Sequence, residues 1–97
     1  MSAPRLYLVA YDIASPRRWR RVFKTLRRVG EHRQLSVFLC RLPPARMARL
    51  QARLRDLIDP EDDRLMVVDL GDAGSATDRL DVGSVARPTE QAWPLVI

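Results

Sequence analysis

The fold is decided near the start of the chain by an apolar run, Leu6-Tyr7-Leu8-Val9-Ala10-Tyr11, which is followed directly by Asp12. A near-continuous run of strand-forming apolar residues is typical of a strand that is buried on both faces. We therefore expect residues 6–11 to form the central strand of a sheet. Ser15 and Pro16 follow as a helix N-cap and a first helical residue, so a helix is predicted to begin there.

The segment after Pro16 has the periodicity of an amphipathic helix. Its apolar residues recur at helical spacing and comprise Trp19, Val22, Phe23, Leu26 and Val29. The rest of its circumference is basic and holds Arg17, Arg18, Arg20, Arg21, Lys24, Arg27 and Arg28. Gly30 is the expected end of this helix, because glycine is favoured just after a helix C-terminus.

Four further segments follow. Residues 32–42 are rich in β-branched and aromatic residues and are predicted to be extended, either as one bulged strand or as a short hairpin. Pro43 and Pro44 open a second helix, whose inner stripe comprises Met47, Leu50, Leu54, Leu57 and Ile58. Residues 59–63 are predicted to form a solvated acidic turn, and residues 64–70 a strand that Gly71 closes.

This order of elements predicts an α+β fold, a ferredoxin-like βαββαβ sandwich in which two helices cover one face of an antiparallel sheet. The length favours a single domain over residues 1–97, with its core at about residues 5–70. Residues 71–91 are predicted to be a loop that can hold a short strand. Residues 92–97 are too apolar to be left in water, and we expect an edge strand that could be added to a partner subunit's sheet.

The composition excludes several classes of protein. The chain is 46% hydrophobic and 30% charged, as soluble globular proteins are. No apolar run approaches the roughly 20 residues that cross a bilayer, and no signal-peptide pattern is present. We therefore expect a cytoplasmic protein with no membrane partner. A core this small also favours a homodimer, and Cys40, as the one cysteine, is expected to be a buried apolar residue rather than half of a disulfide.

The basic charge is concentrated in the first part of the sequence. Residues 1–58 carry 14 lysines and arginines against three acids, whereas residues 59–97 carry three against nine, and 16 of the 17 basic residues are arginine. Because the guanidinium fork pairs with two phosphate oxygens at once, nucleic acid is the expected partner. The alternative is that these arginines only line solvated helix faces.

Asp12 is the first candidate for chemistry, because it follows a buried strand and precedes a basic helix. It could cap backbone amides in the turn or bind a metal ion, and both interpretations stay open at this point. Mg²⁺ prefers oxygen ligands, and a two-fold homodimer would supply a second Asp12 by symmetry. Such an ion could activate water for attack on a phosphodiester. His32 could act as a general base, although its place at a strand entrance favours a surface contact.

Several motifs together resemble the CRISPR-associated endonuclease two family, the small subunit of the CRISPR spacer-acquisition machinery. The resemblance covers roughly residues 5–70. It is carried by Tyr11-Asp12-Ile13, the arginine-rich helix before Gly30, Arg33-Gln34-Leu35-Ser36-Val37-Phe38 with Arg41-Leu42, the helix from Met47 to Ile58, and Asp59-Pro60-Glu61-Asp62.

The resemblance implies a ferredoxin-like homodimer that sits between two CRISPR integrase dimers and holds captured duplex DNA. Members are also described as metal-dependent nucleases on RNA or double-stranded DNA. Carried over residue by residue, this makes Asp12 the catalytic residue and Mg²⁺ ligand. The nucleic-acid-binding residues would be Arg17, Arg18, Arg21 and Arg33, and the residues next to the substrate or the dimer partner would be Tyr11, Ser36 and Phe38.

One departure from the family pattern bears on catalysis. Leu39 and Cys40 stand where many members have an acid and a small residue, which removes one possible second metal ligand. Two hypotheses of different class therefore follow. The first is a Mg²⁺-dependent endonuclease, and the second is a non-catalytic scaffold that binds duplex DNA and the integrase. A related ribonuclease toxin would share the fold and Asp12.

Overall fold

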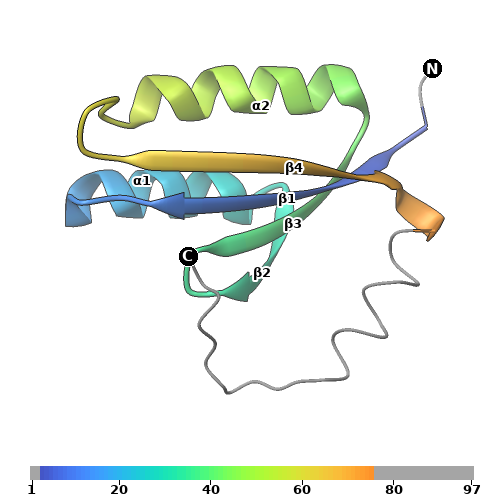
Figure 1. Ribbon diagram of the computed structural model, residues 1–97, viewed down its shortest axis with the longest axis horizontal. Helices are drawn as coiled ribbons and strands as arrows, with labels where there is room; N and C mark the ends of the chain where they lie inside the picture. The colour runs from blue at the N-terminus through green and yellow to red at the C-terminus, as the bar shows by residue number, and fades with distance from the viewer. Residues whose placement is uncertain (1–2, 76–97) are drawn as a thin grey trace.

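The computed structural model describes residues 3–75 and shows six elements of secondary structure (Figure 1). In chain order these are β1 (Arg5–Asp12), α1 (Pro16–Arg27), β2 (Gly30–Gln34), β3 (Val37–Leu42), α2 (Pro44–Leu57) and β4 (Arg64–Asp72). This βαββαβ order confirms the predicted α+β, ferredoxin-like fold. The edge strand predicted at residues 92–97 lies outside the described residues, as does most of the loop predicted at residues 71–91.

The sheet has four antiparallel strands in the order β2-β3-β1-β4, so β1 is an interior strand as its apolar run predicts. Both helices cover the same face of this sheet and pack against each other. They run in opposite directions, α1 from blue to cyan and α2 from green to yellow in Figure 1. Between them and the sheet lies the main core.

The two faces of β1 have different partners. Tyr7, Val9 and Tyr11 belong to the main core, whose members from the helices are Val22, Leu26, Met47, Leu50 and Leu54. Leu6 instead forms a second cluster with Leu39 of β3, against which Leu8 and Leu70 pack. Since strand side chains alternate between faces, the even-numbered residues of β1, Asp12 included, belong to this second face. We call it the open face, because neither α1 nor α2 covers it.

The start of α1 agrees with the sequence and its end does not. Ser15 is the N-cap, and its hydroxyl accepts a hydrogen bond from the amide N–H of Arg18 at 3.3 Å. The helix then ends at Arg27, and the prediction that Gly30 terminates it was wrong, because Gly30 is the first residue of β2. Glycine is needed there for close packing: a Cβ would lie 2.7 Å from Cys40 Sγ and 3.0 Å from the carbonyl oxygen of Leu39.

The pairing of the strands decides the predictions for residues 32–42 and for the strand that begins at Arg64. Residues 32–42 form a hairpin of β2 and β3, with a register shift between His32 and Gln34. Strand β4 runs past Gly71 to Asp72, so the prediction that Gly71 closes it was wrong. Gly71 has a φ of 103° beside a register shift opposite Leu6 and Tyr7. Because glycine accepts this conformation, the strand absorbs an irregularity there and continues.

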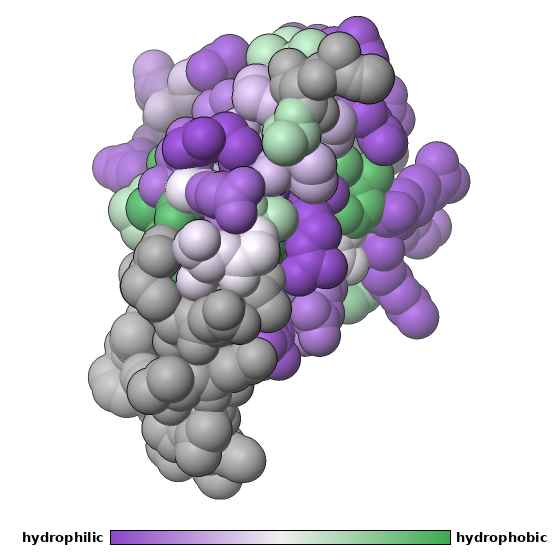
Figure 2. All heavy atoms as spheres, turned by 90° about the vertical axis from the view of Figure 1, so that its right-hand side faces the viewer, coloured by the Kyte–Doolittle hydropathy of each residue, from purple (hydrophilic) through white to green (hydrophobic). Residues whose placement is uncertain are grey.

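The face of the molecule that bears the start of α2 is mostly polar (Figure 2). Figure 2 shows hydrophilic side chains over much of the end that bears the start of α2, with hydrophobic residues in separate patches. Within residues 3–75 no helix has the length and apolar character needed to cross a membrane.

The contact at Gly30 leads to a stability prediction. Gly30→Ala should lower the free energy of unfolding by about 1–3 kcal/mol, the usual cost of an overpacked contact, because Cys40 Sγ and a backbone carbonyl both stand in the way of the new methyl group. Gly74→Ala is the matched control, since its nearest neighbour would be Asp72 Oδ2 at an ordinary 3.4 Å. Urea denaturation measures both, and equal midpoints for the two variants would contradict the packing argument.

Candidate metal and nucleic-acid site

Asp12 ends β1 and is exposed, opposite Arg64 at the start of β4. Within residues 3–75 its carboxylate takes part in no hydrogen bond or ion pair. The structure therefore does not support the interpretation of Asp12 as a cap for the following turn. The amide N–H of Ala14 in that turn donates to the carboxylate of Asp63 at 2.9 Å instead. Asp12 is left available for a ligand.

Asp63 is the buried polar residue that organises this end of the sheet, and it is only 3% exposed. Its carboxylate accepts hydrogen bonds from the amide N–H groups of Ala14 and Asp59, the latter at 2.8 Å. It also accepts two from the guanidinium of Arg18, from Nε at 2.7 Å and Nη2 at 3.2 Å. The expectation that residues 59–63 form a solvated turn was thus wrong for Asp63, because it satisfies amides in two loops and pairs with α1.

The charge-assisted bonds of this cluster shift both partners toward their charged forms. The Arg18 hydrogen bond lowers the pKa of Asp63 well below its ordinary value of 3.8, and the backbone amides of Asp59 and Ala14 act in the same direction against the effect of burial. The Asp63 hydrogen bond raises the pKa of Arg18. The pair is therefore ionised at any physiological pH and ties the β1–α1 loop to the α2–β4 loop.

The four predicted nucleic-acid-binding arginines lie in different settings. Arg17 is exposed in the first turn of α1, whereas Arg18 uses two guanidinium nitrogens on Asp63. Arg33 lies near the end of β2, at the same end of the sheet as Asp12 but separated from β1 by β3, and its Nη1 is 3.7 Å from a carboxylate oxygen of Glu31. Arg21 lines a groove between the helices, described below. That these residues contact nucleic acid stays a prediction.

The residues predicted next to the substrate or partner are mostly core residues. Tyr11 is buried beneath the helices, where its ring stacks on Phe38 and its hydroxyl donates to the carbonyl of Leu35 at 3.4 Å. Burial raises the pKa of Tyr11 to about 12. Ser36, in the β2–β3 turn, accepts a backbone hydrogen bond from the Tyr11 amide at 3.1 Å. Tyr11 and Phe38 therefore support the end of β1 from below, and a direct contact with substrate stays untested.

Two other reactive side chains have structural surroundings. Cys40 is fully buried, and burial raises the pKa of its thiol to about 11, so the thiol is protonated and unreactive at neutral pH. The imidazole of His32 packs against two aromatic rings, with centroids 5.1 Å from Phe23 and 4.8 Å from Phe38. His32 is exposed and its Nε2 lies 3.4 Å from the carbonyl oxygen of Leu35, which agrees with the surface contact expected for it, whereas its packing against the two rings was not predicted.

The described residues of one chain do not form a complete set of ligands for magnesium. Residues 3–75 of one chain hold no group of three His, Cys, Asp or Glu side chains that could bind a metal ion. Asp63 is committed to Arg18, and Leu39 and Cys40 supply no carboxylate. Asp12 has the right donor chemistry for Mg²⁺ and lies on the open face, so the described residues fit this ion where a second copy contributes its own Asp12.

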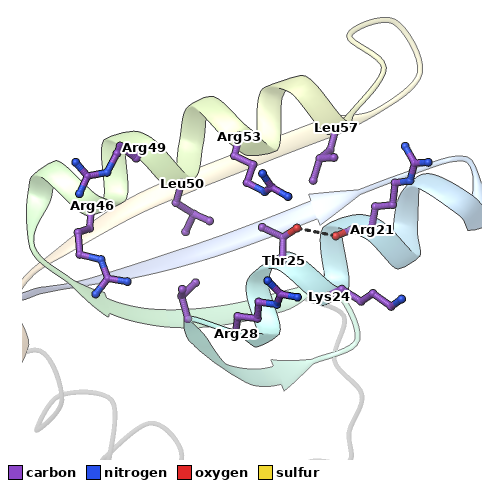
Figure 3. A pocket seen from close by; sticks show the side chains of 10 residues that line it. Arg21, Lys24, Thr25, Arg28, Arg46, Arg49, Leu50, Arg53 and Leu57 are labelled. Atoms are coloured by element: carbon purple, nitrogen blue, oxygen red, sulfur yellow. Dashed lines mark hydrogen bonds between the residues drawn. The ribbon is translucent and has the colours of Figure 1, made fainter.

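A groove of about 640 Å³ separates α1 from α2 on their outer side, away from the sheet. We call it the interhelical groove. Figure 3 shows basic side chains from both helices around it, and its lining comprises Arg21, Lys24, Thr25, Arg28, Val29, Arg46, Arg49, Leu50, Arg53 and Leu57. The arginine-rich circumference of α1 is evident from the sequence, but the groove is not, since it depends on how the two helices pack.

Comparison with known proteins now decides the family. Residues 5–77 match the family described as CRISPR associated protein Cas2. The chain belongs to this Cas2 family. It is similar to the CRISPR-associated endoribonuclease Cas2 1 of Rhodospirillum rubrum, with 50% identity over 72 residues that cover 74% of this chain and 71% of that protein. It is also similar to the CRISPR-associated endoribonuclease Cas2 of Geobacter sulfurreducens, at 44% identity over 70% of this chain and 72% of that protein.

Solved structures of Cas2 proteins and a related chain share the fold. A hypothetical protein, TT1823, from Thermus thermophilus superimposes with a TM-score of 0.67 at 39% identity, over 69% of this chain and 82% of that chain. Cas2 of Streptococcus pyogenes does so with a TM-score of 0.61 at 33% identity, over 64% of this chain and 81% of that chain. The resemblance to the CRISPR-associated endonuclease two family is therefore confirmed, together with the ferredoxin-like fold.

The Asp63 cluster predicts a pH-dependent contribution to stability. Because the folded-state pKa of Asp63 lies below its ordinary value of 3.8, the charged cluster stabilises the protein fully at neutral pH, and this contribution falls as the pH drops below about 4. Asp63→Asn should lower the free energy of unfolding at pH 7, and the difference from the wild type should shrink in acid. Asp63→Ala should cost at least about 2 kcal/mol at pH 7 from its two orphaned amides alone.

Urea denaturation at pH 7 and at pH 3 measures these differences. Asp62→Asn is the matched control, because Asp62 is an exposed acid in the same turn, and it should change stability little at either pH. A difference between wild type and Asp63→Asn that is as large at pH 3 as at pH 7 would contradict the assignment.

Proposed function

We propose that this chain is a Mg²⁺-dependent endonuclease of the CRISPR spacer-acquisition machinery, which cleaves phosphodiester bonds of RNA, duplex DNA or both. The observation that carries the proposal is the carboxylate of Asp12 at the end of β1. It is exposed and takes part in no hydrogen bond or ion pair within residues 3–75. Two relatives that bear the name endoribonuclease support the reaction class. A cytoplasmic location is part of the same proposal.

The active unit in this proposal is a homodimer formed through the open face. On that face Leu6 and Leu39 are already buried, whereas Leu8 is half-buried and, on β4, Met66 and Val68 are 49% and 37% exposed. Met66 and Val68 pair with Ala10 and Leu8, so they share this face. Covering it with a second copy would remove apolar surface from water. Because Asp12 belongs to the same face, a two-fold axis there could bring two Asp12 carboxylates together.

The roles of the residues follow from this arrangement. The two Asp12 carboxylates would hold Mg²⁺, which when bound polarises a phosphate and lowers the pKa of a bound water. Arg17, exposed beside this end of β1, and Arg33, at the same end of the sheet, would orient the phosphate backbone by charge-assisted bonds. Arg18 would act chiefly through Asp63, by holding the β1–α1 loop in place.

A second candidate function is a non-catalytic scaffold that binds duplex DNA and bridges integrase dimers. The observation that favours it is that residues 3–75 hold no group of three metal-binding side chains, since Leu39 and Cys40 add no ligand and Asp63 is paired. The scaffold would use the same basic surfaces and the same homodimer. The two functions differ in whether Asp12 is required for cleavage.

Asp12→Asn tests the nuclease. The amide keeps the shape of the side chain but is a much poorer ligand for Mg²⁺, so Mg²⁺-dependent cleavage of a labelled single-stranded RNA and of a duplex DNA should fall at least about 100-fold. Asp56→Asn on α2 is the matched control because it also removes one exposed carboxylate, and it should cleave as the wild type does. Unchanged cleavage by Asp12→Asn would leave only the scaffold.

The dimer has its own test, in which light scattering after size exclusion gives the mass. The wild type should be dimeric at micromolar concentration, and Met66→Asp/Val68→Asp should be monomeric because it buries two charges in the apolar interface. Leu35→Asp is the control, because Leu35 is 70% exposed in the β2–β3 turn and belongs neither to β1 nor to β4. A wild-type monomer, or a dimer that survives the double substitution, would overturn this interface.

A further inference from the structure

We propose that the interhelical groove binds the phosphate backbone of a duplex nucleic acid, as a surface separate from the Asp12 end of the sheet. The groove lies on the outer side of α1 and α2, whereas Asp12 belongs to the face of the sheet that these helices leave open. Neither Asp12 nor Arg17 lines the groove. The inference therefore stands or falls independently of the nuclease activity.

The basic residues of the groove form two rows with matched spacing. Arg21 and Lys24 on α1 and Arg28 at its C-cap, which keeps a helical backbone conformation, are separated by three and four residues, and Arg46, Arg49 and Arg53 on α2 have the same spacing. Positions i, i+3 and i+7 share one helix face, so each row presents its three cations toward the groove. Because the two helices are antiparallel, Arg28 lies toward the Arg46 end and Arg21 toward the Arg53 end (Figure 3).

The charge of these rows is not neutralised within the described chain. All six cations are exposed and no acid lines the groove. The ion pairs of residues 3–75 involve other arginines, namely Arg5 with Asp69, Arg18 with Asp63 and Arg33 with Glu31. Like charges brought this close repel one another. A polyanion laid along the groove would relieve this repulsion and release its own counterions.

The residue types and dimensions favour phosphate over the carboxylates of an acidic protein. Five of the six cations are arginines, whose forks bind phosphate oxygens in pairs. Seven residues of helix span about 10 Å, which corresponds to about three phosphates of one strand of a duplex. The apolar part of the lining is small, with Leu50 buried and Val29 and Leu57 half-buried, so a protein partner would find little hydrophobic surface to cover.

A binding experiment with two charge-matched variants tests the proposal. The probe is a fluorescein-labelled 30-base-pair duplex DNA of mixed sequence, titrated in EDTA so that neither metal nor cleavage contributes. Arg28→Gln/Arg49→Gln removes one cation from each row. Arg20→Gln/Arg55→Gln is the matched control, because it removes one exposed arginine from each helix outside the groove. Circular dichroism confirms that both variants keep the fold.

The groove variant should bind the duplex roughly tenfold more weakly at 100 mM salt, and its log–log salt slope should be smaller by about 1.8, or 0.9 for each lost phosphate contact. The control should keep the wild-type slope. Equal losses in both variants would mean a net-charge effect and would overturn the proposal, as would no loss in either. The proposal would also be overturned if binding of a labelled polyglutamate peptide required Arg28 and Arg49 while binding of the duplex did not, because the groove would then be a site for an acidic protein.

Asp12→Asn in the same assay separates this inference from the proposed nuclease. It should bind the duplex with the wild-type salt slope, since Asp12 does not line the groove. If it also cleaves as the wild type does, the nuclease proposal fails while the groove proposal stands. If Arg28→Gln/Arg49→Gln binds the duplex normally but Asp12→Asn no longer cleaves, the groove proposal fails and the nuclease proposal stands.

Discussion

Successive side chains of β1 point to opposite faces of the sheet, and the rest of the molecule is arranged around that alternation. Tyr7, Val9 and Tyr11 fill the core beneath the two helices. Leu6 and Leu8 lie on the open face, together with Asp12. Because β1 is an interior strand with partners on both edges, its register cannot slip by one residue without exposing one apolar set and burying the carboxylate. The position of Asp12 is therefore tied to the packing of the core.

The freedom of Asp12 also depends on a second carboxylate. A turn that follows a strand and precedes a helix has amide N–H groups that need acceptors, and a nearby Asp commonly supplies one. Here Asp63 performs this task from the α2–β4 loop, just before β4, and Arg18 balances its buried charge. Because Asp63 accepts the hydrogen bond of this turn, Asp12 is not needed as an acceptor and remains exposed and unpaired within residues 3–75. The same pairing makes Arg18 a supporting residue for the loop, with less of its guanidinium open to a substrate.

The basic residues of the first two-thirds of the chain serve different surfaces once it is folded. Arg17 and Arg33 lie toward the end of the sheet that holds Asp12, whereas Arg21 joins Lys24, Arg28 and the α2 arginines in the interhelical groove. In a dimer formed through the open faces, the two grooves would point outward, on the far sides from the paired Asp12 residues. The basic charge of this small protein is therefore divided between the Asp12 end of the sheet and the interhelical groove, and each surface can be tested by its own substitutions.

Local patterns in the sequence determined the element types, the N-cap at Ser15, the interior place of β1 and the family, because periodicity, capping and short motifs depend on neighbouring residues. They also pointed to Asp12 and to arginine-rich helices. Only the tertiary structure decided that Gly30 serves a close approach to Cys40, that Asp63 is buried, and that the rows on α1 and α2 face one groove. The reason is physical: each of these depends on which surfaces meet across the sheet and between the helices, and the partners lie 9 to 49 residues apart in the chain.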